Sequence, residues 1–152
     1  MGSFEKQLLG DVLIEKVNLL RATIMEASII KTRLFEDILS NNKKIIVDIS
    51  ECDFIDSTFL GVLVASLKRS IEIGGDIKIV IASSSFPEGI VNNSSIQGVF
   101  EIYISVEDAL KSFRFYDKEP QSEFINHIYY LCKKYDKKMT KNFNLLDPPH
   151  TP

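Results

Sequence analysis

The run STFLGVLVASLKRSIEIGG, residues 57–75, constrains the fold more than any other part of the sequence. Its apolar residues recur at helical spacing, and Gly74 and Gly75 end the predicted helix. The segments on either side, 45–49 and 77–81, are short and rich in isoleucine, as strands are. A helix between two such strands is the unit that a parallel crossover requires. The sequence therefore predicts an α/β fold with a mixed or parallel sheet. The apolar stripe of the helix consists of Leu60, Leu63, Val64, Leu67 and Ile71.

Two more elements are predicted before this unit. Residues 11–20 have the composition of a strand, and residues 27–42 form an amphipathic helix that stops at Asn41 and Asn42. The apolar side of this helix is expected to consist of Ile29, Ile30, Leu34, Ile38 and Leu39.

Three weaker elements are predicted after the crossover. A helix is expected from Pro87 to Ser94, with Ser84 or Ser85 as its cap. A brief strand is expected within residues 99–105. The last of the three is a short helix that begins at Ser105, with Asp108 three residues later in a near match to a capping box.

The composition excludes several classes of protein. The chain has 152 residues, the length of one ordinary domain, and a formal net charge of -3, which does not favour nucleic acid as a partner. It lacks a secretion signal and a run of transmembrane length, so we expect a cytoplasmic protein without membrane insertion. Cys52 and Cys132 lie far apart without histidine neighbours, which argues against a metal site. No phosphate loop or dinucleotide fingerprint is present, and we expect no cofactor.

The sequence changes character after the predicted domain, which we assign to residues 1–115. Residues 116–152 form an extension with one amphipathic helix and a frayed, proline-rich end. The helix most simply covers the domain's own apolar surface, but it could also form a homodimer, dock on a partner or touch an acidic surface. Its apolar residues are Phe124, Ile128, Leu131, Cys132 and Tyr135.

The stretch DFIDSTFLGV, residues 53–62, carries the candidate site. Asp56, Ser57 and Thr58 fall in the turn before the predicted central helix, where an aspartate or serine side chain caps the free N–H groups. Thr58 is expected to be the more accessible of the two hydroxyls. Phe59 and Val62 are expected to lie away from the buried stripe, and would thus add apolar docking surface beside Thr58.

An enzyme is not expected. The stretch 53–62 holds Asp53 and Asp56 but no activated nucleophile with its base, and both histidines, His127 and His150, belong to the extension.

Residues 43–80, with 99–113, resemble a STAS domain, the family named after sulphate transporters and anti-sigma factor antagonists. The signature is DSTFLG, residues 56–61, in which Phe59 replaces the usual glycine and Thr58 the commoner serine. The resemblance implies a mixed sheet of four to five strands with helices packed mainly on one side, to which the extension adds a C-terminal helix. It also implies that Thr58, with Ser57 as the alternative, is the phosphorylated hydroxyl.

The resemblance implies an anti-sigma factor antagonist that regulates transcription by partner switching. The unmodified protein would bind a serine/threonine kinase anti-sigma factor through Asp56, Ser57, Thr58, Phe59 and Val62. Phosphate at Thr58 would release this partner, and a cognate phosphatase would restore binding. The alternative is a non-switching accessory subunit or adaptor of a transporter or a larger signalling complex, a reading that Phe59 and the extension favour.

Overall fold

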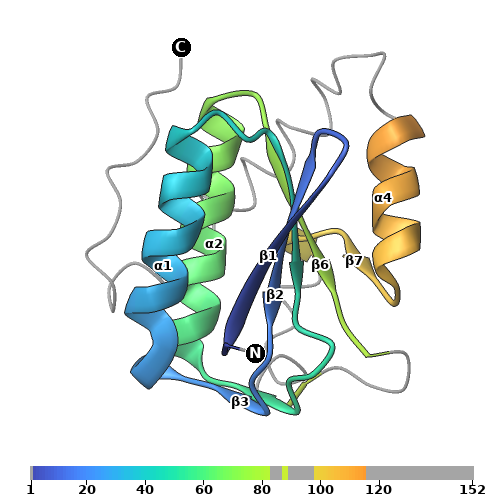
Figure 1. Ribbon diagram of the computed structural model, residues 1–152. Coiled ribbons are helices and arrows are strands. Elements are labelled where there is room, and N and C mark those ends of the chain that lie inside the picture. Colours follow the sequence, from blue (N-terminus) through green and yellow to red (C-terminus); the bar gives the residue numbers. More distant parts are fainter. Residues whose placement is uncertain (1, 83–86, 89–97, 116–152) are drawn as a thin grey trace.

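The computed structural model describes residues 2–82, 87–88 and 98–115, and its centre is a five-stranded sheet (Figure 1). The strand order is β1-β2-β4-β6-β7. β1 and β2 are antiparallel, and every other neighbouring pair is parallel, which confirms the mixed sheet. The strands are β1 (Phe4–Leu9), β2 (Val12–Val17), β4 (Lys44–Asp48), β6 (Asp76–Val80) and β7 (Ile102–Tyr103).

Helices lie on both faces of this sheet. α1 (Ile24–Leu39) and α2 (Ser57–Glu72) pack side by side on one face, and α4 (Val106–Phe115) lies on the other (Figure 1). The crossovers β2-α1-β4 and β4-α2-β6 are the predicted strand, helix, strand units. The α/β class with helices mainly on one side is therefore confirmed.

The three central strands are buried on both faces, which explains why most of their residues are apolar. β1 was missed by sequence reasoning because it is an edge strand with three consecutive polar residues, Glu5, Lys6 and Gln7, of which Lys6 and Gln7 are exposed. A two-residue turn joins it to β2, and Gly10 supplies the positive φ of 63° that this turn uses.

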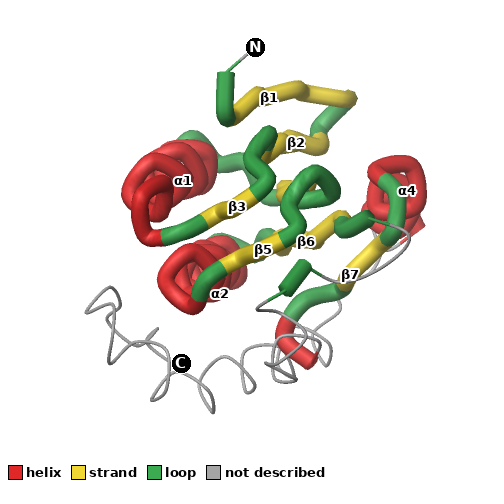
Figure 2. The backbone as a smooth tube through the Cα atoms, turned by 90° about the horizontal axis from the view of Figure 1, so that it is seen from below, coloured by secondary structure: helices red, strands yellow, loops and turns green. Residues whose placement is uncertain are grey.

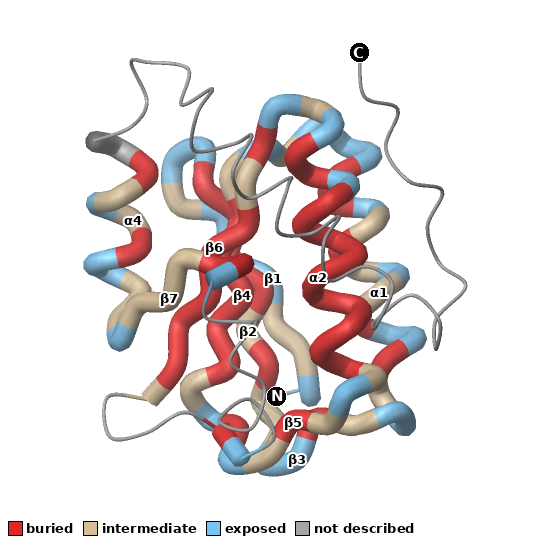
Figure 3. The backbone as a smooth tube through the Cα atoms, turned by 180° about the vertical axis from the view of Figure 1, so that it is seen from behind, coloured by how far each residue is buried: buried red, intermediate tan, exposed pale blue. Residues whose placement is uncertain are grey.

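Two apolar clusters fill the spaces between the layers. Figure 3 shows buried residues along the central strands and α2. The larger one lies between the sheet and the α1-α2 pair, and it includes Ile45, Val47 and Ile77 from the strands. The smaller one lies under α4, with Ala109 and Phe113 packed on Ile46 and Val80 of the sheet.

The apolar face of α1 differs from the predicted one. Ile30, Leu34 and Ile38 are buried as expected, but Ile29 is half exposed and Leu39 is 84% exposed. The helix also begins before the predicted start, because Thr23 caps it through a capping box with Glu26. Its predicted stop is confirmed, since Asn41 has a φ of 67°.

A second, two-stranded parallel sheet consists of β3 (Arg21–Ala22) and β5 (Phe54–Ile55). β3 leads into α1 and β5 leads into α2, so both helices begin beside each other at one end of the molecule (Figure 2). This end of the molecule holds the stretch 53–62.

The remaining predictions have mixed outcomes. The helix at Ser105 is confirmed, and the Ser105 hydroxyl accepts the Asp108 N–H at 3.1 Å. Pro87 is not helical and Glu88 forms a bridge with Phe54, while the rest of the helix predicted to Ser94 lies outside the described residues. The extension 116–152 and its helix also lie outside them.

Candidate functional site at the start of α2

Asp56 joins the starts of two helices. Its Oδ1 accepts the N–H of Phe59 at 2.8 Å, so Asp56 is the N-cap of α2. Its Oδ2 accepts the N–H of Ile24, the first residue of α1, at 2.7 Å. Each bond satisfies a first-turn donor that has no partner within its own helix. One carboxylate therefore fixes α1 and α2 relative to each other, and the cap predicted for Asp56 is confirmed.

The chain before Asp56 is held by backbone hydrogen bonds to β3 and the loop before it. The Leu20 carbonyl accepts from Asp53 and Phe54, and the Ala22 carbonyl accepts from the Asp56 N–H at 3.0 Å. Arg21 adds a cation–π contact, with its guanidinium 4.1 Å from the centre of the Phe54 ring. The start of α2 is thus positioned by fixed backbone geometry on its N-terminal side.

The two hydroxyls occupy the first two helical positions of α2. Ser57 is exposed and Thr58 is half-buried, so the expectation that Thr58 is the more accessible of the two is wrong. Both residues lie in the first turn, where backbone N–H groups lack intrahelical acceptors and the helix end carries partial positive charge. A negative group on either hydroxyl would lie beside Asp56.

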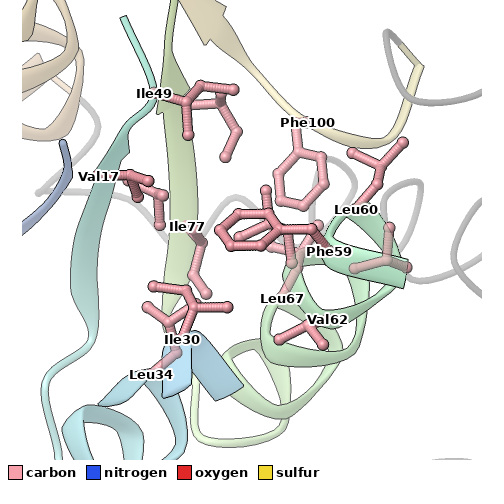
Figure 4. Packing of buried hydrophobic residues seen from close by; sticks show 14 of the residues in the cluster. Val17, Ile30, Leu34, Ile49, Phe59, Leu60, Val62, Leu67, Ile77 and Phe100 are labelled. Atoms are coloured by element: carbon pink, nitrogen blue, oxygen red, sulfur yellow. The ribbon is translucent and has the colours of Figure 1, made fainter. Parts of the chain in front are cut away.

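Phe59 and Val62 do not present the expected docking surface. Phe59 has 0% exposure and Val62 has 2%, so the prediction that they face solvent is wrong. Figure 4 shows the Phe59 ring beside Phe100 within the larger apolar cluster. The physical reason is that α2 packs against both the sheet and α1, which buries more of its circumference than one stripe. Phe59 therefore packs in the core beneath the candidate site and is not part of its surface.

Exposed apolar side chains instead come from α1 and the loop before β3. Leu20 is 67% exposed, Ile24 66% and Met25 78%. The hydrogen bonds of Leu20 to residues 53 and 54, and of Ile24 to Asp56, place them next to the start of α2. Sequence reasoning missed these three residues. The signal in the sequence was the pair Ile24 and Met25, two apolar residues directly after the capping threonine. They precede the buried face of the helix.

The loop before the site has a negative local potential. Burial and, to a smaller extent, the neighbouring carboxylates of Asp48, Asp53 and Glu51 raise the pKa of the Cys52 thiol to about 12. The thiol stays protonated at neutral pH and is no nucleophile. An added phosphate would increase the negative charge of this end.

Within residues 2–82, 87–88 and 98–115, histidine, cysteine and carboxylate side chains form no group of three or more that could hold a metal ion. None of the helices described is both long enough and apolar enough to cross a membrane.

A family model for the STAS domain matches residues 10–109, most of the chain. The protein therefore belongs to the STAS domain family. No curated protein matches it in sequence.

Solved structures with the same fold include three proteins whose descriptions name anti-sigma factor antagonists. A candidate antagonist from Thermotoga maritima has 24% identity and a TM-score of 0.62, over 73% of this chain and 94% of that chain. An antagonist from Mycobacterium paratuberculosis has 16% identity and a TM-score of 0.61, over 73% and 92%. The antagonist SpoIIAA in its unphosphorylated form has 13% identity and a TM-score of 0.57, over 73% and 97%.

Proposed function

We propose that this protein is an anti-sigma factor antagonist that works by partner switching. The unmodified protein binds an anti-sigma factor of the serine/threonine kinase type, and phosphorylation of Thr58 releases it. The observation that carries this proposal is the combination at the joined starts of α1 and α2. There, hydroxyls at the positive end of a helix lie next to exposed apolar side chains.

The contact surface that fits this role differs from the one expected from sequence. Ser57, Ile24 and Met25 are exposed and available to a partner, and Thr58 is partly so. Exposed methionine and isoleucine side chains provide the apolar centre that protein interfaces use. Asp56 takes part by holding both helix starts in place.

Phosphate at Thr58 acts on this surface through charge and shape. It adds about two negative charges. Asp56 is the adjacent cap, and Glu51 and Asp53 lie in the loop before β5. The half-buried Thr58 side chain must also turn outward to accommodate the group. A cost of a few kcal/mol lowers affinity by orders of magnitude, since each 1.4 kcal/mol is about tenfold. A cognate phosphatase restores the binding form.

Ser57 is the alternative acceptor because it is the more exposed hydroxyl. A phosphate there lies at the first helical position and meets the same helix end. Both acceptors give the same direction of switching.

A second function remains a candidate because Thr58 is half-buried. A threonine with limited access suits a constitutive adaptor, in which the hydroxyl only belongs to the first turn of α2. The protein would then bind a transporter or a signalling complex regardless of charge at this position.

The test is a pull-down from the native host with wild-type, Thr58→Glu and Ser57→Glu proteins as baits, followed by mass spectrometry. Ser40→Glu serves as the charge control, because Ser40 is exposed and lies at the opposite end of α1. All baits should keep the wild-type circular dichroism spectrum and nearly the same melting temperature, since none of the substituted side chains is fully buried.

Capture of a kinase-type anti-sigma factor by wild type and Ser40→Glu, with loss by Thr58→Glu, supports partner switching. Equal capture of that factor by Thr58→Glu contradicts the switch. Equal capture of transport or scaffold proteins by every bait supports the adaptor.

A further inference from the structure

A cluster of four charged side chains lies between the sheet and α1, apart from the site at the start of α2. Glu15 of β2 and Asp37 of α1 are buried carboxyls, with side-chain exposures of 0% and 2%. Lys6 of the edge strand β1 lies 2.5 Å from Asp37 Oδ1 and 3.5 Å from Glu15 Oε2. Arg33 of α1 donates from Nε and Nη2 to Glu15 Oε1, at 2.9 and 2.8 Å.

The hydrogen bonds of the cluster leave one oxygen of each carboxyl unsatisfied. Within the described part of the chain, Glu15 Oε2 and Asp37 Oδ2 are buried and have no hydrogen-bond donor. A buried carboxylate oxygen without a donor is costly. A single proton held between two carboxyls satisfies an oxygen on each of them, because one side chain then donates and the other accepts.

The surroundings of Glu15 decide its protonation. Burial raises the pKa of Glu15 most, the Asp37 carboxyl raises it as well and Arg33 opposes both, and together they bring this pKa to about 7. The groups that face Glu15 are Lys6 from β1 and Arg33 and Asp37 from α1, while β4 places the uncharged Val47 opposite it. Two cations around the pair do not remove the desolvation cost of a second buried negative charge.

We propose that Glu15 and Asp37 share one proton in the folded protein and form a pH-sensitive clamp between α1 and the β1-β2 hairpin. When the proton leaves, two buried carboxylates repel each other at the point where the hairpin meets the helix. The folded state then loses stability relative to the unfolded chain.

The sign of the pH dependence follows from linkage. Glu15 has an ordinary value of 4.5 and a raised pKa of about 7 in the folded protein. Between these values the folded state holds a proton that the unfolded chain has lost. The contribution to stability is therefore full below about pH 4.5 and is lost as the pH rises through about 7.

The direct test is a carbon-13 NMR titration of the side-chain carboxyl of Glu15 in the full-length wild-type protein. We expect a midpoint near neutral pH, and Asp37→Asn should move it down by at least one pH unit. Asp76→Asn is the matched control. Asp76 is another carboxyl whose pKa burial raises to about 7, but its charged neighbours are Glu101 and Lys78, so this variant should leave the Glu15 midpoint in place.

The second test compares urea unfolding at pH 5 and pH 8. Glu15→Gln mimics the protonated form and removes the titration. The folding equilibrium constant at pH 5 divided by that at pH 8 should therefore be lower than in wild type by about tenfold or more. A Glu15 midpoint below pH 5 in wild type, or an unchanged ratio in Glu15→Gln, overturns the shared proton. Neither result depends on the identity of any partner, so failure here is separate from failure of partner switching.

Discussion

The two faces of the sheet are covered in different ways. On one face, α1 and α2 close a large apolar cluster, and their starts are joined by Asp56. On the other face, α4 covers a smaller cluster, and Lys78 of β6 interacts with Glu101, with the Ser112 hydroxyl and with the Phe113 ring. The candidate site is therefore built on the face with the larger apolar cluster, and its exposed residues lie over buried ones such as Phe59.

The largest expected effect is the loss of stability when a phenylalanine ring is removed from the apolar cluster on either face of the sheet. Phe59→Ala removes a ring with 0% exposure from the larger cluster and should lower the free energy of unfolding by about 3–5 kcal/mol. The matched variant Phe113→Ala, in the smaller cluster under α4, should cost less, about 3 kcal/mol at most, because fewer buried side chains surround it. Urea denaturation measures both. An equal or larger loss for Phe113→Ala would remove the contrast between the faces.

The next effect compares the helix caps of the two faces. Asp56→Ala removes acceptors from the N–H groups of Phe59 and Ile24 and should cost about 2–3 kcal/mol. Ser105→Ala removes the single bond to Asp108 at the start of α4 and should cost about 1 kcal/mol or less. Equal losses in thermal or urea unfolding would mean that Asp56 does not stabilise both helix starts.

The smallest effect on stability is expected for exposed residues of α1. Met25→Ser and Leu39→Ser change side chains that are 78% and 84% exposed at opposite ends of this helix, and each should alter stability by less than about 0.5 kcal/mol. Only Met25→Ser, beside the start of α2, should weaken capture of the partner in the pull-down. Equal losses of capture would place the contact surface elsewhere.

Sequence patterns predicted the central elements because burial determines their composition. The parallel strands β2, β4 and β6 are buried on both faces and mostly apolar, and the helix stops at Asn41 and Gly74 coincide with positive φ angles of 67° and 79°. The edge strand β1 and the two-residue strands β3 and β5 were not predicted. Half of the residues of the edge strand are polar and they do not alternate with the apolar ones, and pairs of residues are too short to show a period.

The position of the candidate site in the sequence was predicted, but the side chains that face solvent and the contacts to α1 were not. The role of Asp56 as a cap followed from its place before the helix, but its second bond, to Ile24, joins residues 32 apart in sequence. The burial of Phe59 and Val62 was missed because a single stripe was assigned to α2, while neighbours on several sides bury most of its residues. Such contacts depend on tertiary packing, and the helical period of 3.6 residues gives no information about it.

The measurement that bears most directly on partner switching is the position and effect of the phosphate. The protein would be incubated with ATP and the kinase-type partner from the pull-down, and the modified residue would be located by mass spectrometry. The dissociation constant would then be measured for the modified and unmodified forms. We expect phosphate on Thr58, and binding of the modified form weaker by about tenfold or more. Phosphate only outside Ser57 and Thr58, or equal affinity of the two forms, would contradict control of binding by charge at the start of α2.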